Sequence, residues 1–284
     1  MNQATTQFEK YLEERFALLH APQNLKEAME YSLFSDGKRI RPLLCMATEA
    51  LNGTIQGTKS FPLAMAIEMV HTYSLIHDDL PAMDDDDIRR GKPSNHIAFG
   101  EAMAILAGDG LLTQSFEVLS DLDIDSKKLK KICIFFSRCA GINGMVGGQV
   151  LDLTLDVTRE HAVTIEEMQA VHRKKTGKLI ELSILGTAVI IGLKQAEFEV
   201  LEDVAKIIGI LFQAVDDLKD DDETTGKTQN IDVINGKVTY ITLLGKKRTS
   251  DYVENLASEA KKLLHTLEDH NTEMLEQIIE KIIA

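Results

Sequence analysis

The distribution of proline is the strongest constraint on what this chain can fold into. All five prolines lie in the first third of the sequence, the last being Pro93, and residues 94–284 contain none. Proline interrupts a helix because it removes a backbone donor and its ring clashes with the preceding turn. A proline-free run of this length therefore favours a bundle of long helices.

The apolar residues of the second half repeat at helical spacing. They recur every three or four positions over 200–215, 253–267 and 274–283, which places them along one face of an α-helix. Alternating strand patterns are scarce, and no repeat of fixed period is present. The polar stretch 220–237 is the best candidate for a linker, and it separates two helical segments rather than two domains. The sequence therefore predicts an all-α fold in a single domain over residues 1–284.

The overall composition excludes several classes of protein. Hydrophobic residues make up 44% of the chain, which is enough for a large core. No run of 18 apolar residues exists, so we expect no membrane span, and the polar N-terminus lacks the apolar segment of a signal peptide. The net charge of -14 argues against a nucleic-acid partner. The three cysteines are odd in number with mostly apolar neighbours, which indicates buried thiols in a reducing cytoplasm.

Two dense aspartate clusters stand far apart in the sequence. The first spans Asp78–Asp87 and the second spans Asp216–Asp222. Carboxylates at this density repel one another unless a cation neutralises them. Hard divalent cations take oxygen ligands, and Mg²⁺ in particular completes its coordination with water and substrate phosphates. The two clusters therefore predict a metal–diphosphate site.

The second cluster has simple helical geometry. Gln213, Asp216, Asp217 and Asp220 are spaced so that they share one stripe of a helix. Carboxylates on the same face destabilise a helix unless something binds them, which favours a ligand. The alternative is a solvated acidic stripe.

The first cluster is interrupted by Pro81. His71, Ser74 and Asp78 fall on one face of the helical run that precedes it. Pro81 then breaks regular helix, so we expect the segment to bulge and to return Asp84 toward Asp78. A calcium-binding EF-hand is disfavoured, because the loop lacks the required glycine and the glutamate at its twelfth position.

Cationic runs provide the opposite charge. The main ones are Gly37-Lys38-Arg39-Ile40-Arg41, Arg89-Arg90-Gly91-Lys92 and residues 172–178. Arginine binds phosphate oxygens bidentately and lysine acts as a point charge. Each run alone also fits a solvated surface patch, and Arg89 and Arg90 have the alternative of pairing with the preceding aspartates. No complete P-loop motif is present, so a nucleotide site of that kind is unsupported.

Taken in order, these blocks resemble the trans-isoprenyl diphosphate synthases, and among them the bacterial farnesyl diphosphate synthases. The resemblance extends from Gly37 to about Gly245 and rests on the following blocks: 37–42, 71–93, Gly144-Met145-Val146-Gly147-Gly148-Gln149, Lys175-Thr176-Gly177, Phe212-Gln213 with Asp216-Asp217, and Gly236-Lys237. It implies a single polyprenyl synthetase domain, with long helices around a central cavity (the isoprenoid synthase fold), and a homodimer.

The resemblance also implies a role for each matching position. The metal ligands would be Asp78, Asp79, Asp84, Asp216 and Asp220, with several Mg²⁺ ions per site and Mn²⁺ able to replace them. The allylic diphosphate would be held by Arg89 and Lys227 with the catalytic residues Lys175, Thr176, Gln213 and Lys237. Isopentenyl diphosphate would be bound by Lys38, Arg41, His71 and Arg90. One departure is Leu218-Lys219 in the middle of the second motif, where the family usually has Ile-Leu; we expect Lys219 to point outward.

The implied reaction joins isopentenyl diphosphate to dimethylallyl and then geranyl diphosphate, giving (2E,6E)-farnesyl diphosphate. Metal ions and cations would neutralise the allylic diphosphate so that it leaves. Chain growth would stop at Tyr73 and Ser74, since Tyr73 lies five residues before Asp78, about 7.5 Å along a helix. Ordinary core packing is the alternative for Tyr73.

Three other functions remain open from the sequence. A geranylgeranyl diphosphate synthase would share the fold and the site. A non-catalytic prenyl synthase subunit commonly loses aspartates, whereas this chain keeps both sets. A class I terpene cyclase would need one diphosphate site, whereas the second cationic set indicates two substrates.

Overall fold

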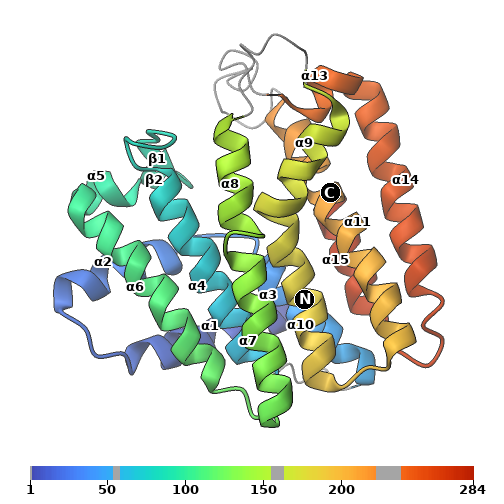
Figure 1. The fold of residues 1–284 in the computed structure, drawn as a ribbon, viewed down its shortest axis with the longest axis horizontal. Helices are drawn as coiled ribbons and strands as arrows, with labels where there is room; N and C mark the ends of the chain where they lie inside the picture. Colours follow the sequence, from blue (N-terminus) through green and yellow to red (C-terminus); the bar gives the residue numbers. More distant parts are fainter. Residues whose placement is uncertain (1, 54–57, 155–162, 222–237) are drawn as a thin grey trace.

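The computed structural model describes residues 2–53, 58–154, 163–221 and 238–284 (Figure 1). Its elements in chain order are α1 (Asn2–Ala17), α2 (Gln23–Leu33), α3 (Ile40–Glu49), η1 (Ala50–Asn52), α4 (Phe61–Asp78), β1 (Ile88–Arg89), β2 (Lys92–Pro93), α5 (Asn95–Phe99), α6 (Glu101–Ser120), α7 (Ser126–Ala140), α8 (Met145–Thr154), α9 (Ile165–His172), η2 (Arg173–Gly177), α10 (Lys178–Ile191), α11 (Gln195–Asp220), α13 (Tyr240–Leu244), α14 (Lys246–Leu264) and α15 (Glu273–Ile283). Over these residues the only β-structure is the short antiparallel pair β1–β2. The prediction of an all-α fold is confirmed.

The prolines occupy positions where helices begin or end. Pro42 and Pro62 lie in the first turns of α3 and α4, and Pro22 immediately precedes α2. A missing N–H does little harm there, because the first-turn donors of a helix have no intrahelical partner. The proline-free part of the chain contains the longest described helix, α11, with 26 residues.

Two helices, α4 and α10, form the centre of the bundle. Most residues of Phe61–Tyr73 and of Leu179–Ile190 are buried. A helix that is apolar on all sides must be covered on all sides. Accordingly, α4 packs against α2, α3 and α6, and α10 packs against α3, α7 and α11 (Figure 1). The outer α14 and α15 instead bury one apolar stripe each.

The cysteines contribute to this interior as predicted. Within the described residues all three are free thiols, with Cys45 and Cys139 buried and Cys133 half-buried. Burial raises the pKa of Cys45 and of Cys139 to about 12, so both stay protonated. No helix in the described ranges combines the length and the apolar character needed to cross a lipid bilayer.

The two aspartate clusters lie toward the same end of the bundle. Helix α4 ends at Asp78 and α11 ends at Asp220, and in Figure 1 both C-terminal ends lie toward the upper side. The kinked segment η2 joins α9 to α10 between them. The helices α4 and α11 therefore carry their acidic ends toward the same end of the bundle.

Candidate active site

The first aspartate cluster folds back on itself after α4. The backbone N–H of Asp84 donates to the carbonyl of Asp78 at 2.8 Å, and that of Asp85 donates to Leu80 at 3.2 Å. Asp85 adopts a left-handed backbone with φ of 53°. The expectation that the segment around Pro81 bulges and returns Asp84 toward Asp78 is confirmed.

Asp78 is buried beside charges of both signs. Burial is the main cause that raises the pKa of this carboxyl to about 6; the positive charges of Lys175 and Arg89 oppose the rise, and the neighbouring Asp84 adds to it. An ionised carboxylate held in this way is stabilised by any cation that arrives beside it. Asp78 and Asp84 are thus suited to hold a divalent metal ion.

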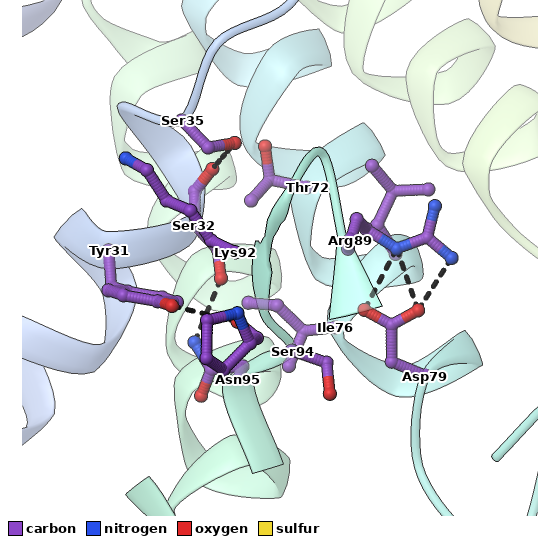
Figure 2. A pocket seen from close by; sticks show the side chains of 12 residues that line it. Tyr31, Ser32, Ser35, Thr72, Ile76, Asp79, Arg89, Lys92, Ser94 and Asn95 are labelled. Carbon is purple, nitrogen blue, oxygen red and sulfur yellow. Dashed lines mark hydrogen bonds and ion pairs between the residues drawn. The ribbon is translucent and has the colours of Figure 1, made fainter. Parts of the chain in front are cut away.

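Asp79 faces a different direction and has a different partner. It is only 2% exposed, and its two carboxylate oxygens accept hydrogen bonds from Nε of Arg89 at 2.7 and 2.8 Å (Figure 2). The Nη2 atom of Arg89 adds an ion pair at 2.5 Å. Arg89 therefore pairs with a preceding aspartate, which is one of the two possibilities that the sequence left open. Both carboxylate oxygens of Asp79 are thus engaged by Arg89 in this structure, and a metal-binding role for Asp79 stays a prediction.

A small cavity lies behind this ion pair. Its volume is about 30 Å³, and hydroxyl and amide side chains of α2, α4 and the β1–β2 region line it, including Ser32, Thr72 and Asn95 (Figure 2). Asn95 donates to the carbonyl of Ala28 and to Ser32 at 2.8 Å each. This polar packing fixes the base of the β1–β2 hairpin, which carries Arg89 and Arg90.

The second aspartate cluster occupies the last turns of α11. Asp217 is 8% exposed and accepts from the backbone N–H of Tyr240 at 2.7 Å and from the amide of Gln213 at 3.2 Å. The other end of the Gln213 amide accepts from the hydroxyl of Thr176 at 3.4 Å. Asp217 therefore anchors α13 to α11, which leaves Asp216 and Asp220 as the acidic residues of the predicted stripe that are candidates for metal.

Lys219 does not point outward as the sequence analysis expected. Its half-buried ammonium donates to the carbonyl of Ile282 in α15 at 3.4 Å. Burial and the nearby Lys38 lower the pKa of Lys219, and Asp216 opposes that shift. Lys219, which departs from the family motif, thus contacts the C-terminal helix α15.

The donor chemistry of the two clusters fits Mg²⁺. All the candidate ligands are carboxylate oxygens, which hard cations prefer. Across the described ranges no three His, Cys, Asp or Glu side chains converge into a complete metal site. Mg²⁺ commonly binds one or two protein carboxylates and takes its other ligands from water and phosphate. A metal here would therefore take its remaining ligands from water and from a bound diphosphate.

A separate group of cations lies beside the N-terminal end of α3. The guanidinium of Arg90 donates to the hydroxyl of Ser35 at 2.9 Å, and a Cβ atom on Gly37 would lie only 3.0 Å from it. Burial, together with the positive charges of Arg41 and Arg90, holds the pKa of His71 well below its usual range. His71 is therefore neutral. Its arginine neighbours attract anions.

Lys175 and Asp152 connect η2 to α8. The ammonium of Lys175 lies 2.6 Å from a carboxylate oxygen of Asp152. Asp152 was not predicted from the sequence. Gln149 was named there within a matching block but given no role, and its amide atoms are buried without a hydrogen-bond partner in the described structure. Their i, i+3 spacing after Gly147-Gly148 is the signal that would have identified them. Lys227 and Lys237 lie outside the described residues.

Tyr73 and His77 line the inner side of α4 below Asp78. Their rings meet edge to face, with centroids 5.7 Å apart, and Tyr73 is 7% exposed. His77 occupies the space above Gly108 of α6, where any Cβ would overlap the imidazole ring. The hydroxyl of Ser74 instead donates to the carbonyl of His71 at 2.9 Å. Tyr73 therefore presents the larger obstacle between α4 and α6.

Comparison with known proteins decides the family. The family model described as polyprenyl synthetase matches residues 22–282. The chain belongs to the polyprenyl synthetase family. It is 42% identical to the farnesyl diphosphate synthase of Bacillus subtilis over 253 residues, covering 87% of this chain and 84% of that protein. It is 43% identical to a putative chloroplastic geranylgeranyl pyrophosphate synthase of Arabidopsis thaliana over 252 residues, covering 87% of this chain and 70% of the relative.

A solved structure of this family confirms the isoprenoid synthase fold. The geranyltransferase of Helicobacter pylori, complexed with magnesium and isoprenyl diphosphate, superposes with a TM-score of 0.84 at 32% identity, covering 99% of this chain and 94% of that one. This polyprenyl synthetase is thus a prenyl diphosphate synthase. Its curated relatives include both farnesyl and geranylgeranyl synthases, so family membership alone leaves the product length open.

Proposed function

We propose that this protein is a farnesyl diphosphate synthase. It joins isopentenyl diphosphate head to tail with dimethylallyl diphosphate and then with geranyl diphosphate, giving (2E,6E)-farnesyl diphosphate and diphosphate. Two observations support the proposal. The buried ring of Tyr73 on the helix before Asp78 supports a short product, and the adjacent Arg89 and Arg90 of one hairpin have different partners, Asp79 on one side and Ser35 beside Gly37 on the other. Neighbouring arginines that point to two separate positions suit two diphosphate substrates.

The first diphosphate position belongs to the allylic substrate. Asp78, Asp84, Asp216 and Asp220 would hold Mg²⁺, which when bound neutralises the allylic diphosphate and makes it a competent leaving group. Lys175 and Arg89 place fixed positive charge beside the same oxygens, and Thr176 and Gln213 orient them. Lys227 and Lys237 complete this proposed set.

The second position belongs to isopentenyl diphosphate. Lys38, Arg41 and Arg90 supply the charge that binds its phosphate oxygens. Neutral His71 contributes a hydrogen bond without adding to the repulsion among the arginines. The double bond of isopentenyl diphosphate then attacks C1 of the allylic cation, and the departed diphosphate accepts the proton. No side-chain nucleophile is needed for this chemistry.

The chain length of the product distinguishes a farnesyl from a geranylgeranyl diphosphate synthase. Incubation with isopentenyl and dimethylallyl diphosphates plus Mg²⁺, followed by chromatography of the dephosphorylated products, should give a C15 alcohol as the main species. A C20 main product would instead identify a geranylgeranyl diphosphate synthase. Absence of any condensation product would contradict both and would favour a non-catalytic subunit.

Replacing Asp79 with asparagine should weaken the binding of the allylic substrate more than it lowers kcat. The asparagine keeps the shape of the side chain but removes the charge that holds Arg89. The KM for geranyl diphosphate should rise by roughly 10-fold, the effect typical of losing a supporting partner. Steady-state kinetics with each substrate varied in turn would measure it. A KM for geranyl diphosphate equal to that of the wild type would show that the pair does not position Arg89.

The chain also carries a surface suited to self-association. Most of its exposed large apolar side chains lie on α5 to α8; those of α6 and α8 are Ile105, Leu106, Phe116, Val146, Val150, Leu151 and Leu153. Exposed apolar surface of this extent marks an interface more often than it faces water. We include in the proposal that residues 1–284 form one domain that assembles through this surface into a homodimer.

A matched pair of leucine variants tests the dimer. Light scattering should give twice the chain mass of 31.6 kDa for the wild type. Leu106→Glu should give the mass of one chain, because a buried unpaired charge is strongly unfavourable at an interface. Leu18→Glu, at another exposed leucine, should leave the mass unchanged. A monomeric wild type would contradict the proposed assembly.

A further inference from the structure

The helix that carries Lys175 and Thr176 departs from regular α-geometry at those residues. Residues Arg173–Gly177 form a π-turn, η2, between α9 and α10. A π-turn accommodates an extra residue and is less favourable than an α-turn, so it survives only where its surroundings hold it in place. The structure shows which groups do so.

Glycines contact the π-turn from two sides. Gly148 of α8 lies so close that a Cβ atom there would overlap the backbone nitrogen of Lys175 and would come within 2.7 Å of its Cα. Gly209 of α11 lies opposite, where a Cβ atom would come within 3.1 Å of the Cα of Gly177. Both contacts are to backbone, which cannot rotate away as a side chain can. The two neighbouring helices therefore contact the π-turn closely: Gly148 has room only for glycine, and at Gly209 a Cβ atom would be tight.

Within the π-turn, two consecutive side chains contact different helices, α8 and α11. Lys175 reaches α8, where it lies 2.6 Å from Asp152, and it is close enough to Asp78 to act on its charge. Thr176 reaches α11, where it donates to Gln213 at 3.4 Å. Moving the turn away from either helix would disturb both contacts together.

We propose that Gly148 and Gly209 are positioning residues that clamp the π-turn, so that Lys175 and Thr176 meet the allylic diphosphate in the orientation needed for its departure. The inference rests on the proposed function, because it concerns the same diphosphate position. It assigns no chemical step to either glycine. Their contribution is the absence of a side chain at two points of backbone contact.

A graded series of alanine variants tests the clamp. Gly148→Ala has the more severe overlap and Gly209→Ala the milder one, while Gly110→Ala in α6 is the control, because its Cβ would meet only the flexible end of Met29 at 3.1 Å. Displacing catalytic groups by about 1 Å costs roughly 100-fold in rate. We expect Gly148→Ala to lower kcat by about 100-fold and to raise the KM for geranyl diphosphate by about 10-fold. Gly209→Ala should show smaller changes in the same direction.

The KM for isopentenyl diphosphate distinguishes a local displacement of Lys175 and Thr176 from a general loss of folded structure. It should stay within about twofold in every variant, since Lys38, Arg41 and Arg90 lie on other elements. Equal rises in both KM values, or a loss of kcat that follows only the folded fraction measured by circular dichroism, would overturn the proposal. If Gly148→Ala does not fold, Gly209→Ala decides, and wild-type kinetics in that folded variant would overturn it.

Binding of inorganic diphosphate keeps this test independent of the proposed reaction. Titration calorimetry with Mg²⁺ present should show about 10-fold weaker binding to Gly148→Ala than to the wild type and to Gly110→Ala. Equal affinities would overturn the clamp even if the reaction proves different. A wild type that binds diphosphate but forms no prenyl product would instead contradict the proposed function alone.

Discussion

Replacing Asp78 with alanine should lower kcat by about 1,000-fold while the protein remains folded. Asp78 ends the central helix α4, and Asp84 returns beside it. Removing its carboxylate deprives the proposed Mg²⁺ site of a ligand, so the allylic diphosphate loses the charge neutralisation needed for departure. Steady-state kinetics with saturating Mg²⁺ and both substrates would measure the loss, and unchanged turnover would refute the metal role.

The same aspartate run supplies the control. Asp87 is exposed and its described contact is through its backbone carbonyl, which accepts from Ser94 at 2.8 Å. Asp87→Ala should therefore keep kcat within about twofold, as is usual for surface substitutions. A comparable loss in both variants would show that the overall acidity of the segment matters, and not a particular ligand.

Without metal, the Asp78→Ala variant should be more stable than the wild type at neutral pH, although it is less active. Burial raises the pKa of Asp78 from an ordinary 3.8 to about 6, so the ionised form opposes folding. The native state then binds more protons than the unfolded state between these values, and this group lowers the stability of the metal-free protein as the pH rises through them. Asp78→Ala removes that dependence. Thermal melts of the metal-free protein at pH 5 and pH 7 should therefore differ less in the variant.

Replacing Tyr73 with alanine should change the main product from C15 to C20 or longer. The ring is nearly fully buried, and it lies against His77, about one and a half turns before Asp78 on α4. Its loss opens space along the direction in which the prenyl tail must extend from the diphosphate. Chromatography of the dephosphorylated products, with geranyl and isopentenyl diphosphates as substrates, would show the shift.

Tyr73→Phe is the matched control for this experiment. It keeps the ring and removes only the hydroxyl, so the product should remain C15. The alanine variant will also lose roughly 3 kcal/mol of stability through the cavity it creates, so the products should be compared at a temperature where both variants are folded. A C15 product from Tyr73→Ala would show that another group stops chain growth.

Local chemistry made much of the fold predictable from the sequence. Proline placement and apolar spacing depend on the backbone of single helices. They correctly predicted the all-α fold and a helical run before the first aspartate cluster, which corresponds to α4. The helical stripe of Gln213, Asp216 and Asp220 followed from the same periodicity, since α11 runs unbroken through it. The bulge after Pro81 was predicted because proline excludes a continuing helix.

The partners within the candidate site were not predictable in this way. Asp78 and Asp79 are neighbours with the same side chain, yet one faces Asp84 and Lys175 and the other is held by Arg89. Sequence reasoning placed both among the metal ligands. The difference arises because consecutive residues at a helix end point in directions about 100° apart, and the β1–β2 hairpin covers only one of those directions.

The sequence by itself thus determined the helices, the two acidic helix ends and the family of the protein. Only the tertiary structure decided that Asp217 accepts a hydrogen bond from Tyr240 and that Lys219 contacts α15. It also decided that Gly148 and Gly209 lie against the π-turn that carries Lys175 and Thr176. The physical reason is the range of the interactions. Helix formation depends on residues three and four positions apart, whereas each of these contacts joins segments that are brought together only when the bundle packs.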